Sequence, residues 1–277
     1  MTWKRLHRCW KIDTSFRQIY EMNPAYLSNI LRLSPGQSAH VYHHLHSISP
    51  LATYRAYEAL GIQILTRFDD EYPERLLHIY DPPWILYAKG SVELLQRQRS
   101  LAVVGTRTPT DYGKKALHYL LPPLIKKKVL IVSGLARGID TLAHHITLRS
   151  QGRTIAVLGS GFDYIYPREN TNLAMNIASH HLLLSEFPPS VPPQKWHFPM
   201  RNRLISGLSD ITFIAEAGER SGSLITAYQA LDQGKEVRAL PGTIFSSMSK
   251  GTNHLIAEGA DPVKSPHDLW HDHWTDK

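Results

Sequence analysis

The sequence predicts an α/β fold in which a doubly wound, mainly parallel sheet is covered by helices on both faces. From Leu101 onward, short apolar runs alternate with longer stretches of helical periodicity. The short runs are apolar throughout, as in strands that are buried on both sides, and do not alternate with polar residues. Helical connections between such strands make the strands parallel. A small helical module is expected ahead of this domain.

The first sixty residues differ in composition from the rest of the chain. They are rich in polar residues and histidine, and the segment Ser34-Pro35-Gly36 interrupts their helical pattern. We therefore expect residues 1–60 to form a small helical module of the SAM-like or helix-hairpin type, and residues 61–277 to form the main domain. Within it, residues 61–90 are expected to supply two short strands around proline-marked turns.

Six further strands and five helices are expected after residue 100. The strands are the apolar runs at 101–105, 129–134, 154–161, 181–187, 211–217 and 236–242. The helix-like stretches lie at 112–127, 140–150, 171–179, 199–209 and 223–233. In a doubly wound sheet, ligands bind outside the carboxyl ends of the strands, so the residues after each strand are candidates for function.

Composition limits the class of protein. The chain has 277 residues with 31 Lys or Arg against 24 Asp or Glu, a formal charge of +7. This balance favours a polyanionic partner, nucleic acid ahead of membrane, although a solubility charge without a target is the alternative. Apolar runs fall short of the roughly 20 residues that cross a bilayer, and the N-terminus lacks a signal-peptide core. With one cysteine, Cys9, no internal disulfide forms. We expect a cytoplasmic protein that does not bind membranes.

The loops after the predicted strands are rich in glycine, serine and threonine. Examples are GTRTPTDYG (105–113), SGLARGID (133–140) and GSGFDYIYP (159–167). Glycines let backbone amides approach an anion, and helix N-termini present unpaired N–H groups. Because the carboxyl ends of parallel strands share one edge of a sheet, these loops together predict a phosphate-binding site.

Two common nucleotide sites do not fit these loops. A P-loop requires four residues between its glycines and a hydroxyl residue after its lysine, but seven residues separate Gly105 from Gly113. A dinucleotide site requires a third glycine, but the loop GSGFDY (159–164) has Tyr164 there. It also requires an acid at the end of the next strand, but the strand that follows LAVVG (101–105) ends in Ser133. We therefore expect no nucleotide cofactor.

Basic and aromatic residues gather in the same loops. The basic residues are Arg107, Arg137, Lys195, Arg201, Arg203, Arg220 and Lys250, and the aromatic residues are Phe162, Tyr164, Tyr166, Trp196 and Phe198. Guanidinium groups pair with phosphates, and aromatic rings stack on unpaired bases at about 1–3 kcal/mol each. The combination favours single-stranded nucleic acid over a duplex, whose bases are already stacked. Packing in the core is the alternative role of each ring.

At these residues the chain resembles the DNA-processing protein A (DprA/Smf) family of bacteria. The motifs run in order over residues 61–263: VVGTR (103–107), SGLARGIDTLAH (133–144), AVLGSGFDYIYPREN (156–170), HFPMRNRLISGLSD (197–210), EAGERSGSLITAYQA (216–230), LPG (240–242) and GTNHLIAEGA (251–260). The resemblance implies an extended Rossmann-like domain that dimerises and binds single-stranded DNA in a basic pocket. It also implies loading of the RecA recombinase during natural transformation, with no catalytic residue, metal or cofactor. Family members often carry a winged helix after this domain, and none is expected in the few residues before Lys277.

The resemblance also assigns the DNA contacts. They are Gly105, Thr106, Arg107, Ser133, Gly134, Lys195, Phe198, Arg201, Asn202 and Arg203. In this assignment Arg107 and Lys195 hold phosphates, while Phe198 stacks on a base or forms the pocket wall. For Arg203 the alternative is a structural ion pair, with Glu216 or Asp210 as the carboxylate.

An enzyme is the main rival interpretation. Related Rossmann-like sheets hydrolyse nucleoside monophosphates at the glycosidic bond, and Glu216 could serve as the carboxylate of such a phosphoribohydrolase. The spread of basic and aromatic residues suits an extended ligand better than a small pocket. A protein-interaction scaffold, the third class, would explain the fold but not the basic loops.

Several histidines are weaker candidates. His40, His43 and His44, or His271 and His273, could gather a metal, but without acid or thiol ligands beside them we expect solvated or half-buried side chains.

Two residues of the GIDTLAH motif have expected structural roles. We expect Asp140 to act as the N-cap of a helix and His144 to pack or hydrogen-bond within that helix.

Overall fold

The computed structural model describes residues 3–96, 99–271 and 274. They fall into two compact units, Met1–Ile64 and Leu65–Lys277, each with a hydrophobic core of its own. Among the described residues, no helix combines the length and the apolar character that spanning a bilayer requires.

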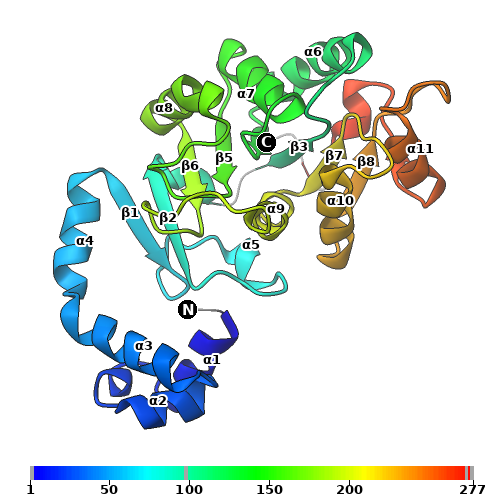
Figure 1. The fold of residues 1–277 in the computed structure, drawn as a ribbon. Coiled ribbons are helices and arrows are strands. Elements are labelled where there is room, and N and C mark those ends of the chain that lie inside the picture. Colours follow the sequence, from blue (N-terminus) through cyan, green and yellow to red (C-terminus); the bar gives the residue numbers. More distant parts are fainter. Residues whose placement is uncertain (1–2, 97–98, 272–273, 275–277) are drawn as a thin grey trace. The chain divides into compact units, whose positions relative to one another are not determined.

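The first unit is helical, as the sequence predicts (Figure 1, blue). Its elements are α1 (Trp3–Ile12), the 3-10 turn η1 (Gln18–Tyr20), α2 (Pro24–Leu31), α3 (Pro35–Ser47) and α4 (Pro50–Ala59). The break at residues 34–36 is the start of α3. The Ser34 hydroxyl accepts the backbone N–H of Gln37, and the Gln37 side chain accepts the backbone N–H of Ser34, a reciprocal cap that fixes where the helix begins.

The sheet has nine strands in the order β1-β2-β6-β5-β4-β3-β7-β8-β9. The strands are β1 (Ile62–Thr66), β2 (Ile85–Gly90), β3 (Ser100–Val104), β4 (Leu130–Ser133), β5 (Thr154–Leu158), β6 (Leu182–Ser185), β7 (Ile211–Ile214), β8 (Glu236–Ala239) and β9 (Asp261–Pro262). From β6 to β9 neighbouring strands are parallel, and β2 is antiparallel to β6. The prediction of a mainly parallel sheet is therefore confirmed.

Helices cover both faces of the sheet, so the doubly wound arrangement is confirmed as well (Figure 1). One face carries α6 (Asp111–Lys126), α7 (Ile139–Arg149) and α8 (Thr171–His180). The other carries α5 (Glu74–Leu77), α9 (His197–Gly207), α10 (Gly222–Asp232) and α11 (Lys250–Ala257). Short 3-10 turns complete the unit: η2 (Val92–Leu95), η3 (Arg168–Asn170) and η4 (Pro266–Leu269). Within β3, Leu101 and Val103 face the first group while Ala102 and Val104 face the second, which explains why the strand is apolar throughout.

The chain changes direction at β3. It passes from β3 through β4 and β5 to β6 on one side, and then returns through α9 to β7 on the other side of β3. The connections that leave the carboxyl ends of β3 and β7 therefore diverge, which opens a crevice of the kind in which doubly wound proteins bind ligands.

Two details differ from the sequence-based expectation. The strands expected at 154–161, 211–217 and 236–242 each end three residues earlier, at Leu158, Ile214 and Ala239, because the chain leaves the sheet while it is still largely buried. The segment after β8, for which no helix or strand range was predicted, contains α11 and leads to the short edge strand β9.

Candidate nucleic-acid interface

A cleft of about 620 Å3 lies at the carboxyl edge of the sheet, and we refer to it as the carboxyl-edge cleft. Its walls come from the loop after β3, the loop after β4, the start of α9 and the start of α10. The lining residues are Val104, Gly105, Arg107, Ala136, Asp140, Tyr166, Lys195, Phe198, Pro199, Arg201, Asn202, Ser221, Gly222, Ser223, Ile225 and Thr226. A smaller cavity of about 140 Å3 adjoins it and shares Arg107, Ala136, Tyr166, Phe198 and Arg201 with it.

Three of the predicted cationic residues converge on this cleft. Arg107 and Lys195 are exposed at its walls, whereas Arg201 is only 4% exposed. The Arg201 guanidinium donates to the backbone oxygens of Gly134, at 2.5 Å, and of Val157, and its Nε donates to Asn202 Oδ1 at 3.1 Å. Arg201 is therefore held against the ends of β4 and β5 and forms a fixed, charged floor.

The close approach of Arg201 depends on a glycine and is balanced by an acid. A Cβ atom at Gly134 would lie 2.6 Å from the Arg201 guanidinium carbon, so a larger residue there would displace the arginine. Burial lowers the pKa of Arg201 to about 10, against the opposing effect of Asp140. Burial likewise raises the pKa of Asp140 to about 6, although Arg201 counteracts the rise. Near neutral pH the Arg201 side chain is protonated and the Asp140 carboxyl is largely ionised, so these two buried charges offset each other. The net positive charge of the cleft therefore comes from the exposed Arg107 and Lys195.

Aromatic rings form one wall of the cleft. Phe198 and Tyr166 lie with ring centroids 5.5 Å apart and planes inclined at 50°. Phe198 packs directly above Gly159, where a Cβ atom would come within 2.9 Å of its ring. Both rings line the cleft, and Tyr166 is exposed, so faces suited to stacking are available beside the cations.

The first turn of α10 is a part of the cleft that the sequence-based residue list omits. Ser221, Gly222, Ser223 and Thr226 all line the cleft. Ser221 is the N-cap, and its hydroxyl accepts the N–H of Ser223 at 3.4 Å. The N–H groups of a first helical turn have no partner within the helix and favour anions. The sequence did contain a glycine- and serine-rich motif after β7. It indicates a part of this cleft only once β7 is known to lie beside β3.

Arg203 is a correction to the predicted DNA contacts. It does not line the carboxyl-edge cleft, and its Nη2 donates to both carboxylate oxygens of Glu186, at 2.9 and 2.8 Å. The side chains are only 11% and 18% exposed. A structural ion pair was the alternative role for Arg203, but both suggested partners were wrong, since Asp210 pairs with Arg75 and Glu216 is engaged elsewhere.

Ser133 and Thr106 also lie outside the cleft. The Ser133 hydroxyl is buried and donates to the carbonyl of Val103 in β3, at 2.6 Å, so it links β4 to β3. The N–H of Thr106 donates to the carbonyl of Glu216 at 2.7 Å. Gly134 lines the smaller cavity, but its N–H donates to Asp140 Oδ2 at 3.1 Å, so that amide is already occupied. Gly105 and Asn202 line the cleft as expected.

Glu216, the carboxylate of the rival enzymatic interpretation, is buried at the start of α6. One oxygen accepts the backbone N–H of Thr110 at 2.9 Å and the other accepts the Thr110 hydroxyl at 2.5 Å. Thr110 is itself the N-cap of α6. Glu216 therefore anchors a helix N-terminus, where a negative charge is stabilised, and it is not among the residues that line the cleft.

Of the two expectations for α7, the one for Asp140 was wrong and the one for His144 holds in part, because His144 is packed in the core but its hydrogen bond leaves the helix. Asp140 lies inside the first turn, and the N-cap position belongs to Gly138, whose φ of +78° favours glycine. His144 bonds outside its own helix, with Nδ1 lying 2.8 Å from the Thr154 hydroxyl oxygen. That hydroxyl donates to the carbonyl of Ile131, so His144 Nδ1 is the donor and its Nε2 carries no proton. Burial lowers the pKa of His144 to about 3.

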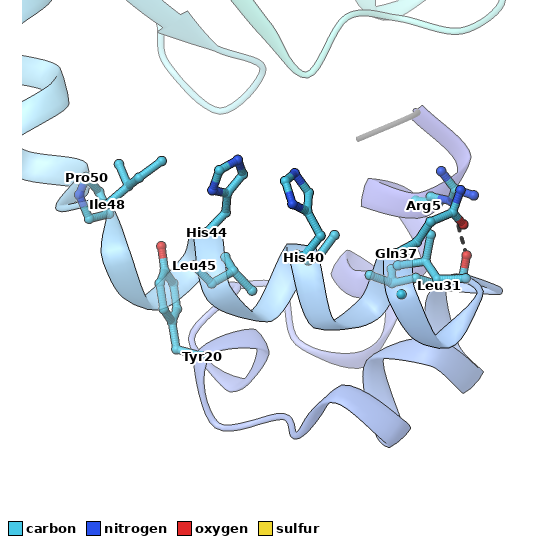
Figure 2. Close-up of a pocket in the computed structure, with 12 residues that line it drawn as sticks. Arg5, Tyr20, Leu31, Gln37, His40, His44, Leu45, Ile48 and Pro50 are labelled. Atoms are coloured by element: carbon cyan, nitrogen blue, oxygen red, sulfur yellow. Dashed lines mark hydrogen bonds between the residues drawn. The ribbon is translucent and has the colours of Figure 1, made fainter.

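The first unit contains a cavity of its own, of about 670 Å3. Its floor is apolar, and Figure 2 shows the imidazoles of His40 and His44 projecting from the same side of α3, with Arg5 at the other end. The two rings lie 4.4 Å apart between centroids. Within residues 3–96, 99–271 and 274, no group of three or more His, Cys, Asp or Glu is placed to hold a metal ion; His273 lies outside these residues.

The comparisons with known proteins agree with this fold. A family model described as DNA recombination-mediator protein A matches residues 63–273. The chain belongs to this family. The resemblance to DprA/Smf proteins found in the sequence is thereby confirmed, and the mediator family accounts for most of the second unit.

Individual relatives support the assignment. The chain is 50% identical over 215 residues to the DNA processing protein DprA of Bacillus subtilis, covering 78% of this chain and 72% of that protein. It is 46% identical over 201 residues to DprA of Streptococcus pneumoniae, covering 73% and 71%. The X-ray structure of the Streptococcus pneumoniae protein superposes with a TM-score of 0.83 at 36% identity, covering 97% and 92%. A structure of DprA from Helicobacter pylori, which concerns its single-stranded DNA binding mode, gives a TM-score of 0.68 at 33% identity, covering 75% and 93%.

Proposed function

We propose that this protein is a recombination mediator that binds single-stranded DNA in the carboxyl-edge cleft. The observation that carries the proposal is convergence: Arg107, Lys195 and Arg201 come from separate segments of the chain and line one cleft. The aromatic wall of Phe198 and Tyr166 stands beside them. Charge with stacking faces is the combination that holds an unpaired strand. The single-stranded DNA binding mode of the Helicobacter pylori relative supports the same ligand class.

The residues of the cleft have two roles: some bind phosphates of the strand, and others support and position those that do. The exposed guanidinium of Arg107 and ammonium of Lys195 pair with phosphates and release counterions, which makes affinity fall with salt. The buried Arg201, whose charge is offset by Asp140, keeps its bonds to Gly134 and Val157 and supports the floor of the cleft. The first turn of α10 presents the positive end of its helix dipole to a further phosphate. Because these contacts reach phosphates and ring faces, binding has little dependence on base sequence.

The rival enzymatic function gains no support from this geometry. Hydrolysis of a nucleoside monophosphate at its glycosidic bond needs a carboxylate at the ligand, whereas Glu216 accepts two hydrogen bonds from Thr110 away from the cleft. Incubation of the protein with nucleoside monophosphates should release no free base. Release of base that Glu216→Gln abolishes would restore the rival interpretation.

We also propose, from family membership, that the DNA-bound form is a homodimer that loads RecA during natural transformation. The loop after β8 supports a dimer surface in the later part of the domain. Ile244 and Phe245 in this loop are 78% and 91% exposed, which is unusual for adjacent large apolar residues on a monomer. A mass that remains at the 31.5 kDa of one chain in light scattering across micromolar concentrations would rule out a stable dimer.

The direct test compares a labelled single-stranded oligonucleotide with its duplex at two salt concentrations, by fluorescence anisotropy. The single strand should bind more tightly at both salts, and both affinities should fall as salt rises. Equal affinity for strand and duplex would contradict stacking in the cleft, and affinity independent of salt would contradict phosphate capture. For RecA loading, RecA-dependent ATP hydrolysis on the strand should start sooner when this protein is already bound.

A further inference from the structure

Trp196 is a large aromatic residue between two residues that line the carboxyl-edge cleft, Lys195 and Phe198, and none of the assigned contacts includes it. It is the residue directly before α9, and its side chain is 59% exposed. Its neighbour Lys195 lines the cleft, as does Phe198 two residues further on. Burial of an indole normally stabilises a fold, and most of this indole is exposed. Its exposure is therefore better explained by a function at the surface than by packing.

The indole packs against two other rings even though it is exposed. It meets His197 edge-on, with ring centroids 4.1 Å apart, and it also meets Phe187 edge-on at 6.4 Å. Phe187 and His197 in turn stack on each other at 3.9 Å. His197 is buried, and its Nδ1 lies 3.1 Å from the carbonyl oxygen of Gly159. This cluster of Trp196, His197 and Phe187 is therefore anchored to the end of β5, and a ligand that stacks on the indole would lose little side-chain entropy.

The cluster extends the cleft in one direction along the sheet. The cleft lies over the ends of β3, β4 and β7, whereas Phe187 follows β6, which is two strands from β4 in the sheet order. The acid directly before it, Glu186, is paired with Arg203. A polyanion leaving the cleft in this direction therefore meets a carboxylate that Arg203 has already neutralised.

We propose that Trp196 is a stacking position for an unpaired base next to the phosphate held at Lys195, so that the strand leaves the cleft over the carboxyl end of β6. The proposal rests on the proposed function and deepens it, because it names the residue on which the base next to the cleft stacks. Stacking on an indole requires a base whose face is free. Trp196 therefore adds to the preference for single strands over duplexes, and it contributes nothing to the capture of phosphates.

The test separates bases from phosphates. An oligothymidine strand and an abasic strand of equal length are bound to wild type, Trp196→Ala, Trp196→Phe and a control, Tyr119→Ala. Tyr119 is also exposed, but it lies on α6 outside the cleft. Trp196→Ala should bind oligothymidine about tenfold more weakly, Trp196→Phe should lose no more than about threefold, and Tyr119→Ala should match wild type. On the abasic strand all four proteins should bind alike.

Two results would overturn the proposal. The first is unchanged binding of oligothymidine by Trp196→Ala, and the second is an equal loss on the abasic strand, which would mean that the indole supports the site by packing. Either result leaves the proposed function standing if Arg107→Ala still weakens binding. A wild-type protein that binds neither strand would instead remove the proposed function itself.

Tryptophan fluorescence gives an independent reading if Trp196→Ala does not fold. Oligothymidine should quench the emission of wild type, and most of that quenching should be absent in Trp196→Phe, which keeps a ring in place. Quenching that persists unchanged in Trp196→Phe would also overturn the proposal, because the responding indole would be another one.

Discussion

Cationic residues lie at both edges of the sheet: the amino edge, where the parallel strands begin, and the carboxyl edge, where they end. The two edges differ in how these side chains are buried and bonded. At the amino edge, exposed lysines and arginines stand where α6 and α7 end and where β5 begins: Lys126, Lys127, Lys128, Arg149 and Arg153. Positive side chains at the last turn of a helix complement its dipole, so these residues have a structural reason to be there. At the carboxyl edge, Arg201 and Arg203 are buried and bonded to specific acceptors.

A cavity with positive charge does not by itself make a nucleic-acid site. The amino edge also has a cavity of about 670 Å3, lined by Ser91, Glu93, Leu94, Ile125, Lys128, Gln151, Gly152 and Arg153. These lining residues include no aromatic ring, and the helices beside them present C-termini that repel anions. The carboxyl-edge cleft has rings, glycines and helix N-termini as well as charge. The comparison teaches that the surroundings of the cations, and not their number, distinguish the proposed binding site from a solvated surface.

The largest expected difference between the edges is in stability. Arg203→Met should lower the free energy of unfolding by about 3–5 kcal/mol, because it leaves the carboxylate of Glu186 buried without its partner. Arg153→Ala at the amino edge should change it by less than about 0.5 kcal/mol. Urea unfolding measures both. Adding Glu186→Gln to Arg203→Met should recover part of the loss, and equal losses for Arg203→Met and Arg153→Ala would erase the contrast between the edges.

A second prediction concerns α7, which begins at one edge and ends at the other. The pKa of His144 is about 3 in the fold and ordinarily 6.5, so below pH 6.5 the unfolded chain takes up a proton that the folded chain refuses. The contribution of this group to the free energy of unfolding is fully present above about pH 6.5 and is lost as the pH decreases. The loss amounts to about 2 kcal/mol between pH 7.5 and pH 5. Urea unfolding at the two pH values should show the fall in wild type and a smaller one in His144→Leu. His118→Gln, which removes an exposed histidine, should retain the wild-type fall; an undiminished fall in His144→Leu would refute the assignment.

The third and smallest effect is on binding. Arg107→Ala and Lys195→Ala should each weaken single-strand binding about tenfold, and each should reduce the slope of log affinity against log salt by about one. Lys126→Ala at the amino edge removes the same charge from an exposed position and should change neither quantity. Anisotropy titrations at several salt concentrations decide the point. If Lys126→Ala weakens binding as much as Lys195→Ala, total charge governs affinity and the cleft does not.

Periodicity in the sequence was enough to place most of the strands and helices, but not the roles of neighbouring side chains. Arg201 and Arg203 stand two residues apart on α9, which turns them about 200° from each other around the helix axis. One therefore reaches the carbonyls at the ends of β4 and β5, and the other reaches Glu186. The motif could not separate the two because it does not say which side of the helix faces the cleft. For a related reason the motif could not show that the Ser133 hydroxyl bonds within the sheet, because its acceptor, the Val103 carbonyl, lies on a neighbouring strand.

By itself the sequence determined the class of fold, the order of its strands and helices, and the edge at which glycine-rich and basic loops collect. These follow from local patterns of apolar residues, and from the rule that parallel strands end on one side. Only the tertiary structure decided that β3 lies beside β7, that Arg201 is a buried floor and Arg203 an internal ion pair, and that Trp196 is exposed. Burial and partnership depend on segments far apart in the chain, so no local pattern contains them.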